Sequence, residues 1–182
     1  QILTEVFSDE SAKLHNFNVT VTAGPTREAL DPVRYISNNS SGKQGMAIAE
    51  ASIAAGANVT LIAGPGVAPS REAIKRIDVS SAEEMLDQVI REMPKTDLFI
   101  SVAAVADYKA KTISANKIKK RDLAKTSPRI ELEETPDIIR CVASMKVRPL
   151  VIGFAAETNS AVENAKIKLK DKNLDAIVVN DV

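Results

Sequence analysis

The sequence predicts an α/β fold in which helices cover both faces of a doubly wound, mainly parallel sheet. Two observations indicate this class. Short apolar and β-branched runs alternate with stretches of helical pattern along the chain, and the runs are nearly continuous in apolar character. Such strands are typical of parallel sheets that are buried on both faces. Strands that alternate with helices favour right-handed crossovers, and therefore a Rossmann-like architecture.

The strands are expected where the apolar runs are short and bounded by turn or helix signals. They are residues 18–22 (NVTVT), 58–63 (NVTLIA), 74–79 (IKRIDV), 97–103 (DLFISVA), 149–155 (PLVIGFA) and 175–180 (DAIVVN). Four helices are expected between them, at residues 42–55, 82–92, 135–145 and 160–172.

Each helix has its own local signals. The first is rich in alanine and ends before Gly56, which suits a C-terminal cap. Ser81 and Glu84 form a capping box for the second, and Thr135 followed by Pro136 suits the start of the third. The last helix is expected to turn three apolar side chains toward the sheet: Val162, Ala165 and Leu169.

One segment breaks the alternation of strands and helices. Residues 108–128 (YKAKTISANKIKKRDLAKTSP) are rich in lysine and arginine, contain few large apolar residues and have no clear period. A long basic excursion after a strand is either a solvated loop or a flap over a binding site.

Composition excludes several classes of protein. The 24 lysines and arginines balance 24 aspartates and glutamates, so no overall basic field attracts nucleic acid or an anionic membrane. No apolar run is long enough for a membrane span. His15 is the only histidine, which excludes most histidine-dependent metal and serine hydrolases.

The remaining bulk features concern compartment and domain organisation. Cys141 is the only cysteine and no signal peptide is recognised, so a reducing cytoplasm is expected. Cys141 lies in an apolar stretch and is interpreted as core packing. Residues 1–17 are expected to be a leader or interdomain linker and residues 18–182 a nucleotide-binding domain. Because the chain begins at Gln1 and stops just after a strand, it is interpreted as a piece of a longer protein that lacks a C-terminal tail.

The loop after the first strand is the first candidate site. It runs TAGPTREALDPVRYISNNSSGKQG and offers small residues, hydroxyls and a cation that suit a phosphate cradle: Gly24, Ser40, Ser41, Gly42 and Lys43. The loop matches neither a P-loop nor G-x-G-x-x-G, and the second strand ends IAGPG without an acidic residue. These gaps weaken the interpretation as an NAD(P)-dependent oxidoreductase. A purely structural Gly/Ser-rich turn remains open.

Lys168 and Lys172 form a second candidate, because residues four apart lie on one helix face. Two ammonium groups one turn apart suit a polyphosphate, while a solvated lysine face is the alternative.

Several longer motifs together carry a family resemblance. They are the loop quoted above, SVAAVADY (101–108), NKIKK (116–120), ETPDI (134–138), VIGFAAETN (151–159) and the final NDV. Over residues 18–182 the chain resembles the synthetase domain of bacterial phosphopantothenoylcysteine synthetase. In that family the domain usually follows a flavin-dependent decarboxylase on one polypeptide, so FMN is expected only on that partner domain.

The resemblance implies a ligase of coenzyme A synthesis that joins 4′-phosphopantothenate to cysteine, with CTP as co-substrate. The carboxylate would attack the α-phosphate, releasing pyrophosphate, and cysteine would then displace CMP from the acyl-cytidylate. Mg²⁺ is expected to accompany the triphosphate, with protein ligands unknown. A cytoplasmic homodimer is also implied.

Residue roles carry over to matching positions. Asn38 and Lys117 match the family's catalytic residues. The nucleotide-binding positions are matched by Ser101, Val102, Ala103, Asp107, Lys117, Pro136, Asp137, Ile138, Ile139, Phe154, Lys168 and Lys172. Two alternatives stay open: a nucleotide-binding Rossmann domain without catalysis and, less favoured, the oxidoreductase.

Overall fold

The computed structural model describes residues 13–70, 72, 74–119, 129–157 and 160–181. Six strands form one sheet in the order β10-β9-β6-β1-β4-β5, and every neighbouring pair is parallel. They are β1 (Asn18–Ala23), β4 (Asn58–Ala63), β5 (Lys75–Asp78), β6 (Leu98–Ser101), β9 (Leu150–Glu157) and β10 (Ala176–Asp181). Counted along the chain, this is the strand order 3-2-1-4-5-6 of dinucleotide-binding folds. The predicted fold class and all six predicted strands are confirmed.

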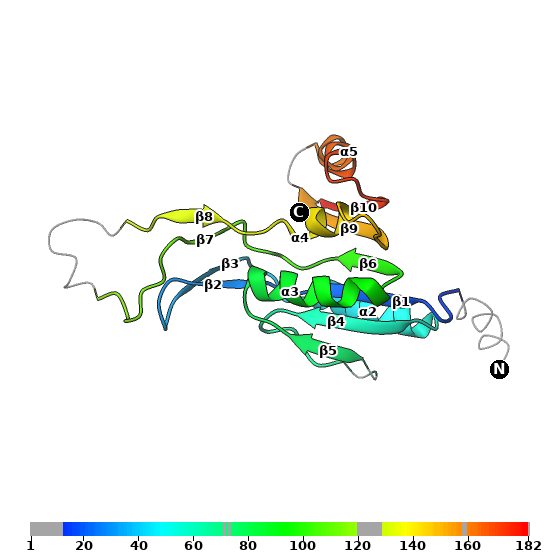
Figure 1. Ribbon diagram of the computed structural model, residues 1–182, viewed down its shortest axis with the longest axis horizontal. Helices are drawn as coiled ribbons and strands as arrows, with labels where there is room; N and C mark the ends of the chain where they lie inside the picture. Colours follow the sequence, from blue (N-terminus) through cyan, green and yellow to red (C-terminus); the bar gives the residue numbers. More distant parts are fainter. Residues whose placement is uncertain (1–12, 71, 73, 120–128, 158–159, 182) are drawn as a thin grey trace.

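Helices cover both faces of this sheet (Figure 1). On one face, α2 (Lys43–Ala54) buries Met46 and Ala49 against β1 and β4. On the other, α3 (Ala82–Glu92), the short 3₁₀ helix η1 (Met93–Lys95) and α4 (Ile138–Ala143) pack against Phe99 and Val151. The last helix, α5 (Ala161–Asp171), follows β9 and precedes β10. No helix among the described residues is long and apolar enough to cross a membrane.

The helix ends follow the local signals for α2 and α3. Gly56 has φ 89°, and its N–H donates to the carbonyl of Ile53. The Ser81 hydroxyl accepts from the Glu84 N–H at 3.2 Å, as a capping box requires. The Glu84 carboxylate reaches the Ser80 N–H at 2.7 Å instead of the N-cap's own. Both helices therefore begin and end within one residue of the predicted bounds.

The prediction for α4 was wrong at its start. The helix begins at Ile138 with Asp137 as N-cap, whose carboxylate accepts from the Arg140 N–H at 3.2 Å. Thr135 lies two residues before this cap, and its N–H donates to the Asp107 carbonyl and its hydroxyl to the Ala106 carbonyl. The residue that the sequence suggested as a cap is thus tied to the loop after β6.

Two predictions of burial were also wrong. Val162 on α5 is 58% exposed, whereas Ala165 is buried as expected. The helix packs against β9 and β10 at one edge of the sheet, so only a narrow stripe of its surface is covered. Cys141 is exposed because Ile138 and Val142, four residues apart, take the face of α4 that meets the sheet.

Two antiparallel ribbons project from the carboxyl edge of the sheet (Figure 1). One pairs β2 (Arg27–Ala29) with β3 (Tyr35–Ser37), and the other pairs β7 (Tyr108–Ala110) with β8 (Leu132–Glu134). The basic segment was predicted to be irregular from residue 108, and that is wrong for its first residues, which form β7. Residues 120–128 of the segment lie outside the described residues, as do residues 1–12 of the predicted leader.

Candidate functional site

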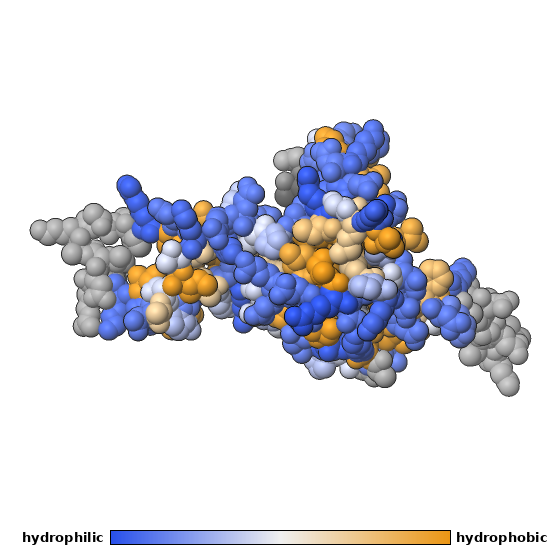
Figure 2. Space-filling model, viewed as in Figure 1, coloured by the Kyte–Doolittle hydropathy of each residue, from blue (hydrophilic) through white to orange (hydrophobic). Residues whose placement is uncertain are grey.

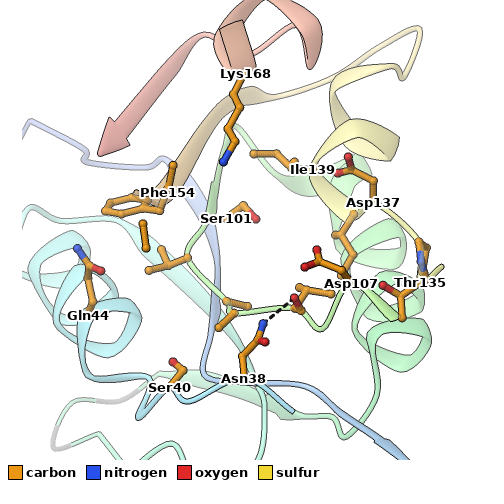
Figure 3. A pocket seen from close by; sticks show the side chains of 18 of the residues that line it. Asn38, Ser40, Gln44, Ser101, Asp107, Thr135, Asp137, Ile139, Phe154 and Lys168 are labelled. Atoms are coloured by element: carbon orange, nitrogen blue, oxygen red, sulfur yellow. Dashed lines mark hydrogen bonds between the residues drawn. The ribbon is translucent and has the colours of Figure 1, made fainter. Parts of the chain in front are cut away.

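A cavity of ≈ 820 Å³ opens at the carboxyl edge of the sheet. Its walls come from the loops after β1 and β6, from β9 and from the start of α4, and α5 closes one side (Figure 3). The strand order reverses direction between β1 and β6. Ligands of open α/β sheets bind outside the carboxyl ends of the strands at such a switch point. The fold therefore puts this cavity where a ligand site is expected.

Three glycines, Gly24, Gly42 and Gly45, allow β1 and α2 to approach each other closely. A Cβ atom on Gly42 would lie 3.0 Å from the backbone nitrogen of Gly24, and one on Gly45 would lie 2.5 Å from the Cβ of Ala23. Gly24 and Gly42 both have positive φ. These are the tasks of the three glycines in a dinucleotide fingerprint. Residues 25–41 separate the first glycine from the other two, so the loop does not match the linear G-x-G-x-x-G motif although the glycines themselves are present.

The N-terminus of α2 faces the cavity, and the helix has few groups of its own to neutralise the partial positive charge at this end. Its N-cap Gly42 has no side-chain cap, and its first turn contains no acidic residue. Ser40 and Gln44 line the cavity beside this turn, and the Ser40 hydroxyl lies 3.4 Å from the Gly42 nitrogen. A helix N-terminus favours anions. Ser41 and Lys43, which were predicted as part of the same cradle, are exposed and do not line the cavity.

On the other side of β1, the chain itself fills the edge of the sheet. A Cβ on Gly64 would lie 1.9 Å from the carbonyl oxygen of Pro25. The side chain of Val67, only 6% exposed, packs against the positions where Gly24 and Gly42 would carry a Cβ. The space beyond β4, where a dinucleotide fold holds its first nucleotide against an acidic residue, is occupied here by protein. This packing disfavours the oxidoreductase hypothesis.

The loop after β6 is fastened to the end of β1. The backbone N–H groups of Val102 and Ala103 donate to the Thr22 hydroxyl at 3.2 and 3.3 Å. Farther along, the Ala106 N–H donates to the hydroxyl of Thr26 at 3.0 Å. These bonds hold the loop against buried threonines, so the wall of the cavity formed by residues 101–105 is fixed by the core.

Asn38 lies at the mouth of the cavity and is oriented by this loop. Its Nδ2 donates to the carbonyl of Val105 at 2.9 Å (Figure 3). The bond turns the nitrogen of the amide toward the β6 loop and its oxygen away. Asn38 is exposed, but this bond gives its amide a defined orientation.

The two lysines predicted as a pair, Lys168 and Lys172, have different surroundings. Lys168 points from α5 into the cavity (Figure 3). Lys172 does not line it; its Nζ lies 2.9 Å from a carboxylate oxygen of Asp137, the N-cap of α4. Of the two lysines predicted to bind a polyphosphate, the structure brings only Lys168 into the cavity.

Most predicted nucleotide positions do meet at this cavity. Its walls contain Ser101, Val102, Ala103, Asp107, Pro136, Asp137, Ile138, Ile139, Phe154 and Lys168, together with Asn38 and Ser40. Lys117 is the main exception. It lies in the segment that follows β7, where the neighbouring Ile118 bonds to the β2–β3 loop. Lys117 is not among the residues that line the cavity.

Several cavity residues were missed by sequence reasoning. Gln44 and Asn180 meet at the cavity wall, where the Asn180 amide donates to the Gln44 oxygen at 3.0 Å. Glu134 and Thr135 add polar groups from the base of the second ribbon. Polar residues in a helix's first turn or at a strand's end are typical of a solvated surface, so only the fold could have assembled them.

Two charged groups on the ribbons beside the site have shifted pKa values because they are paired. The Arg34 guanidinium that donates to Asp31 holds the pKa of that carboxyl well below its usual value, against the effect of burial. Carboxylates of Glu83 and Glu133 raise the pKa of Lys109 at the base of the second ribbon. The described residues contain no group of three or more histidines, cysteines or acidic residues arranged to hold a metal ion.

Comparisons with known proteins agree on one family. Residues 14–182 match the family model of the DNA/pantothenate metabolism flavoprotein C-terminal domain. The chain is 51% identical over 170 residues to the coenzyme A biosynthesis bifunctional protein CoaBC of Escherichia coli (strain K12), covering 93% of this chain and 42% of that protein. The CoaBC protein of Bacillus subtilis (strain 168) is 44% identical over 178 residues, covering 97% and 43%.

A solved structure extends the agreement to three dimensions. The crystal structure of the C-terminal domain of a CoaBC protein superposes with a TM-score of 0.81 at 41% identity, covering 94% of this chain and 80% of that one. The chain spans less than half the length of the bifunctional relatives it matches.

Proposed function

Since the chain belongs to the family of the DNA/pantothenate metabolism flavoprotein C-terminal domain, we propose that it is the phosphopantothenate–cysteine ligase of coenzyme A biosynthesis. One observation carries the proposal. The cavity at the strand-order switch gathers Asn38, Asp107 and Lys168, which are far apart in the sequence but match the ligase motifs. Similarity to CoaBC proteins along nearly the whole chain supports the same activity.

The chemical problem is that a carboxylate does not form an amide unaided. In the proposed reaction, the carboxylate of 4′-phosphopantothenate attacks the α-phosphorus of CTP, and the bond to the pyrophosphate leaving group breaks. The amine of cysteine then attacks the carbonyl of the acyl-cytidylate, and CMP leaves. The nucleotide supplies the leaving group, so the protein's contribution is alignment and charge stabilisation.

The cavity residues suit these two tasks. Asn38 can donate to the substrate carboxylate or the acyl-phosphate oxygens without changing charge. Lys168 supplies a cation and the N-terminus of α2 a partial positive charge on the side of the phosphates. Phe154 offers an apolar wall. The choice of CTP over ATP rests on the family resemblance.

We also propose that Mg²⁺ binds with the triphosphate in the same cavity. Magnesium is usually held by one or two carboxylates together with phosphate oxygens and waters. Among the described residues, the carboxylates that line these walls are Asp107, Glu134 and Asp137. Asp107 is our proposed protein contact, because it matches a nucleotide-binding position of the family whereas Glu134 does not, and because Lys172 already pairs with Asp137. Bound there, the ion would neutralise phosphate charge.

We also propose that the ligase is a homodimer, joined through its projecting ribbons. Figure 2 shows a hydrophobic patch on these ribbons. The ribbons and the loops at their ends carry six large exposed apolar side chains: Val33, Tyr35, Tyr108, Ile113, Ile130 and Leu132. Leu132→Asp combined with Ile113→Asp should convert the dimer to a monomer in sedimentation velocity. Val147→Asp, a change at a 90% exposed site away from the ribbons, should not.

The remaining proposals concern the parent protein. The matched relatives are bifunctional, and we propose that a flavin-dependent decarboxylase is the other activity. FMN would belong to that part, and the protein would act in the cytoplasm. Residues 18–182 would form the ligase domain, with residues 1–17 as the linker.

The direct test is pyrophosphate release in the presence of 4′-phosphopantothenate and Mg²⁺, with CTP or ATP, and with or without cysteine. Pyrophosphate that depends on CTP and phosphopantothenate, with CMP appearing only after cysteine is added, is the expected result. Binding of CTP without pyrophosphate release would replace the ligase by a binding module. Tight binding of NADH with weak binding of CTP would favour an oxidoreductase.

Asn38→Asp gives the site-specific version of this test. Loss of a positioned donor at a developing charge costs about 100-fold or more in rate, so pyrophosphate release should fall by at least that factor. Asn58→Asp is the matched control, because Asn58 is an exposed asparagine at the start of β4, the opposite edge of the sheet. Equal rates in the two variants would remove Asn38 from the active site.

A further inference from the structure

Asp31 is a fully buried carboxylate that the reaction does not use. It lies in the loop between β2 and β3, and its side chain has 0% exposure. The carboxylate accepts from the backbone N–H groups of Val33 at 2.8 Å and Arg34 at 2.9 Å. It also accepts from Nε of Arg34 at 3.0 Å. Burying a charge is costly unless partners compensate, so these bonds explain how the charge is tolerated.

The same ion pair reaches across to the second ribbon. The backbone N–H of Ile118 donates to Oδ2 of Asp31 at 3.1 Å. Nη2 of Arg34 donates to the carbonyl oxygen of Ile118 at 2.7 Å. Both backbone polar groups of one residue are therefore held by an acid and a base more than eighty positions earlier in the chain. A further bond, from the Ser114 N–H to the Leu30 carbonyl at 3.0 Å, fastens the same segment.

This arrangement has a direct effect on Lys117. The N–H of Ile118 belongs to the peptide plane that joins it to Lys117, so fixing that N–H fixes the plane. The side chain of Lys117 remains exposed while the backbone beneath it is held. A lysine is a flexible side chain with roughly 2 kcal/mol of rotamer entropy, and an anchored backbone restricts where its ammonium group can reach.

We propose that Asp31, through its pair with Arg34, is a positioning residue for Lys117. The inference rests on the proposed function, in which Lys117 contacts nucleotide phosphate and supports the second half-reaction. Asp31 does not touch substrate; it sets the path of the segment that carries the lysine. Misplacement of a reacting group by about 1 Å can cost about 100-fold in rate, so such a buried clamp has kinetic value.

The electrostatics of the pair agree with this role. Hydrogen bonds from the Arg34 guanidinium hold the pKa of Asp31 well below its usual value. The carboxylate therefore stays ionised throughout the neutral range. The ion pair between Asp31 and Arg34 therefore keeps its charges under assay conditions. Any pH dependence of the ligase rate would come from the titration of other groups.

The first experiment tests the clamp without any assay of activity. Hydrogen exchange of the Ile118 amide and trypsin cleavage after Lys117 are measured in the full chain and in Asp31→Asn. Loss of amide protection and faster cleavage are expected in the variant. Unchanged exchange would overturn the proposal. Arg34→Gln is a second variant that keeps the test valid if Asp31→Asn does not fold, because the Arg34 side chain is 48% exposed.

The second experiment is a double-mutant cycle on CMP release. Lys117→Gln and Asp31→Asn should each slow turnover, the latter by about 10- to 100-fold. In the Lys117→Gln background, Asp31→Asn should add less than about 2-fold, because two residues that act as one unit are not additive. Lys146→Gln, an exposed lysine outside the two ribbons, is the control that should keep the wild-type rate.

The outcomes separate the two proposals. Full additivity would show that Asp31 acts on stability in general, and would overturn the positioning role. A wild-type rate in Lys117→Gln would remove Lys117 from the reaction, and the positioning role with it, although pyrophosphate release by the unmodified chain would still support the ligase. No pyrophosphate release by the unmodified chain would refute the proposed function itself.

Discussion

The two halves of the carboxyl edge of the sheet, on either side of β1, have opposite character. On the β4 side, Gly64 packs on the Pro25 carbonyl and Val67 fills the angle between Gly24 and Gly42. On the β6 side, the same edge opens into the ≈ 820 Å³ cavity. Both halves belong to one strand order, so topology alone does not decide which half binds a ligand. Local packing decides it.

This difference explains why the linear motifs were ambiguous. The glycines carry out the close contacts of a dinucleotide fold, yet the half that would hold the first nucleotide is filled by protein. A nucleotide can instead be accommodated beyond β6, near Phe154 and Lys168. We call the β4 side of this edge the closed half and the β6 side the open half. Substitutions in the closed half should therefore change stability, and those in the open half should change ligand binding.

The largest effect is expected for Gly64→Ala in the closed half. Its new Cβ would lie 1.9 Å from a backbone oxygen, which cannot move as a side chain could. Overpacking of this kind costs about 3 kcal/mol, so urea denaturation should show a loss of that size. CTP affinity, measured by calorimetry on the folded fraction, should remain within about 2-fold, because Gly64 is not among the residues that line the cavity.

Gly66→Ala is the matched control for that clash. Gly66 has φ 85°, and a Cβ added there would meet no atom within 4 Å. Only backbone strain of about 1 kcal/mol is expected there. If both variants lose the same stability, the contact between Gly64 and Pro25 is not what closes this half.

The next largest effect is expected for Lys168→Gln in the open half. A charge-assisted contact to phosphate contributes about 1.5–3 kcal/mol, so CTP should bind about 10- to 100-fold more weakly. The free energy of unfolding should change by no more than about 0.5 kcal/mol, as for most surface substitutions. Lys170→Gln, an exposed lysine on the same helix, should leave both quantities unchanged. An equal loss of affinity in Lys170→Gln would indicate general electrostatics and not a site.

The sequence predicted the sheet well because its signals are local. Most of the six strands are nearly continuous apolar or β-branched runs, and Ser81 with Glu84 identified the start of α3 without any knowledge of the fold. The ribbons were not predicted, because β2, β3, β7 and β8 are three-residue strands of mixed polarity. Such strands are stabilised by their partners and not by their own pattern.

The candidate site was predictable only in part, for a related reason. Motif resemblance identified the cavity residues one by one, including Asp107 and Phe154, but not their arrangement. Gln44 and Asn180 meet across 136 positions of sequence, which no local pattern records. The start of α4 was misplaced because Thr135 forms tertiary bonds to Ala106 and Asp107 that compete with capping.

The smallest effect is expected for Lys172→Gln. It distinguishes, within the open half, a lysine that contacts the nucleotide from one that only neutralises a neighbouring carboxylate. Lys172 pairs with Asp137 at 2.9 Å and does not line the cavity. We expect it to neutralise a carboxylate that would otherwise repel phosphate, which at a partly exposed site corresponds to about 0.2–1 kcal/mol. CTP should bind about 2- to 5-fold more weakly to this variant, by calorimetry at low salt.

Asp137→Asn separates neutralisation from direct contact, because asparagine is as good an N-cap as aspartate. If Lys172 only neutralises Asp137, then adding Asp137→Asn to Lys172→Gln should restore nearly wild-type affinity. If Lys172 binds phosphate itself, the double variant should stay as weak as the single one, and Lys172→Gln should approach the loss seen in Lys168→Gln. The first result would leave Lys168 as the only lysine of the pair that contacts nucleotide, and the second would restore the two-lysine clamp that the helical spacing suggests.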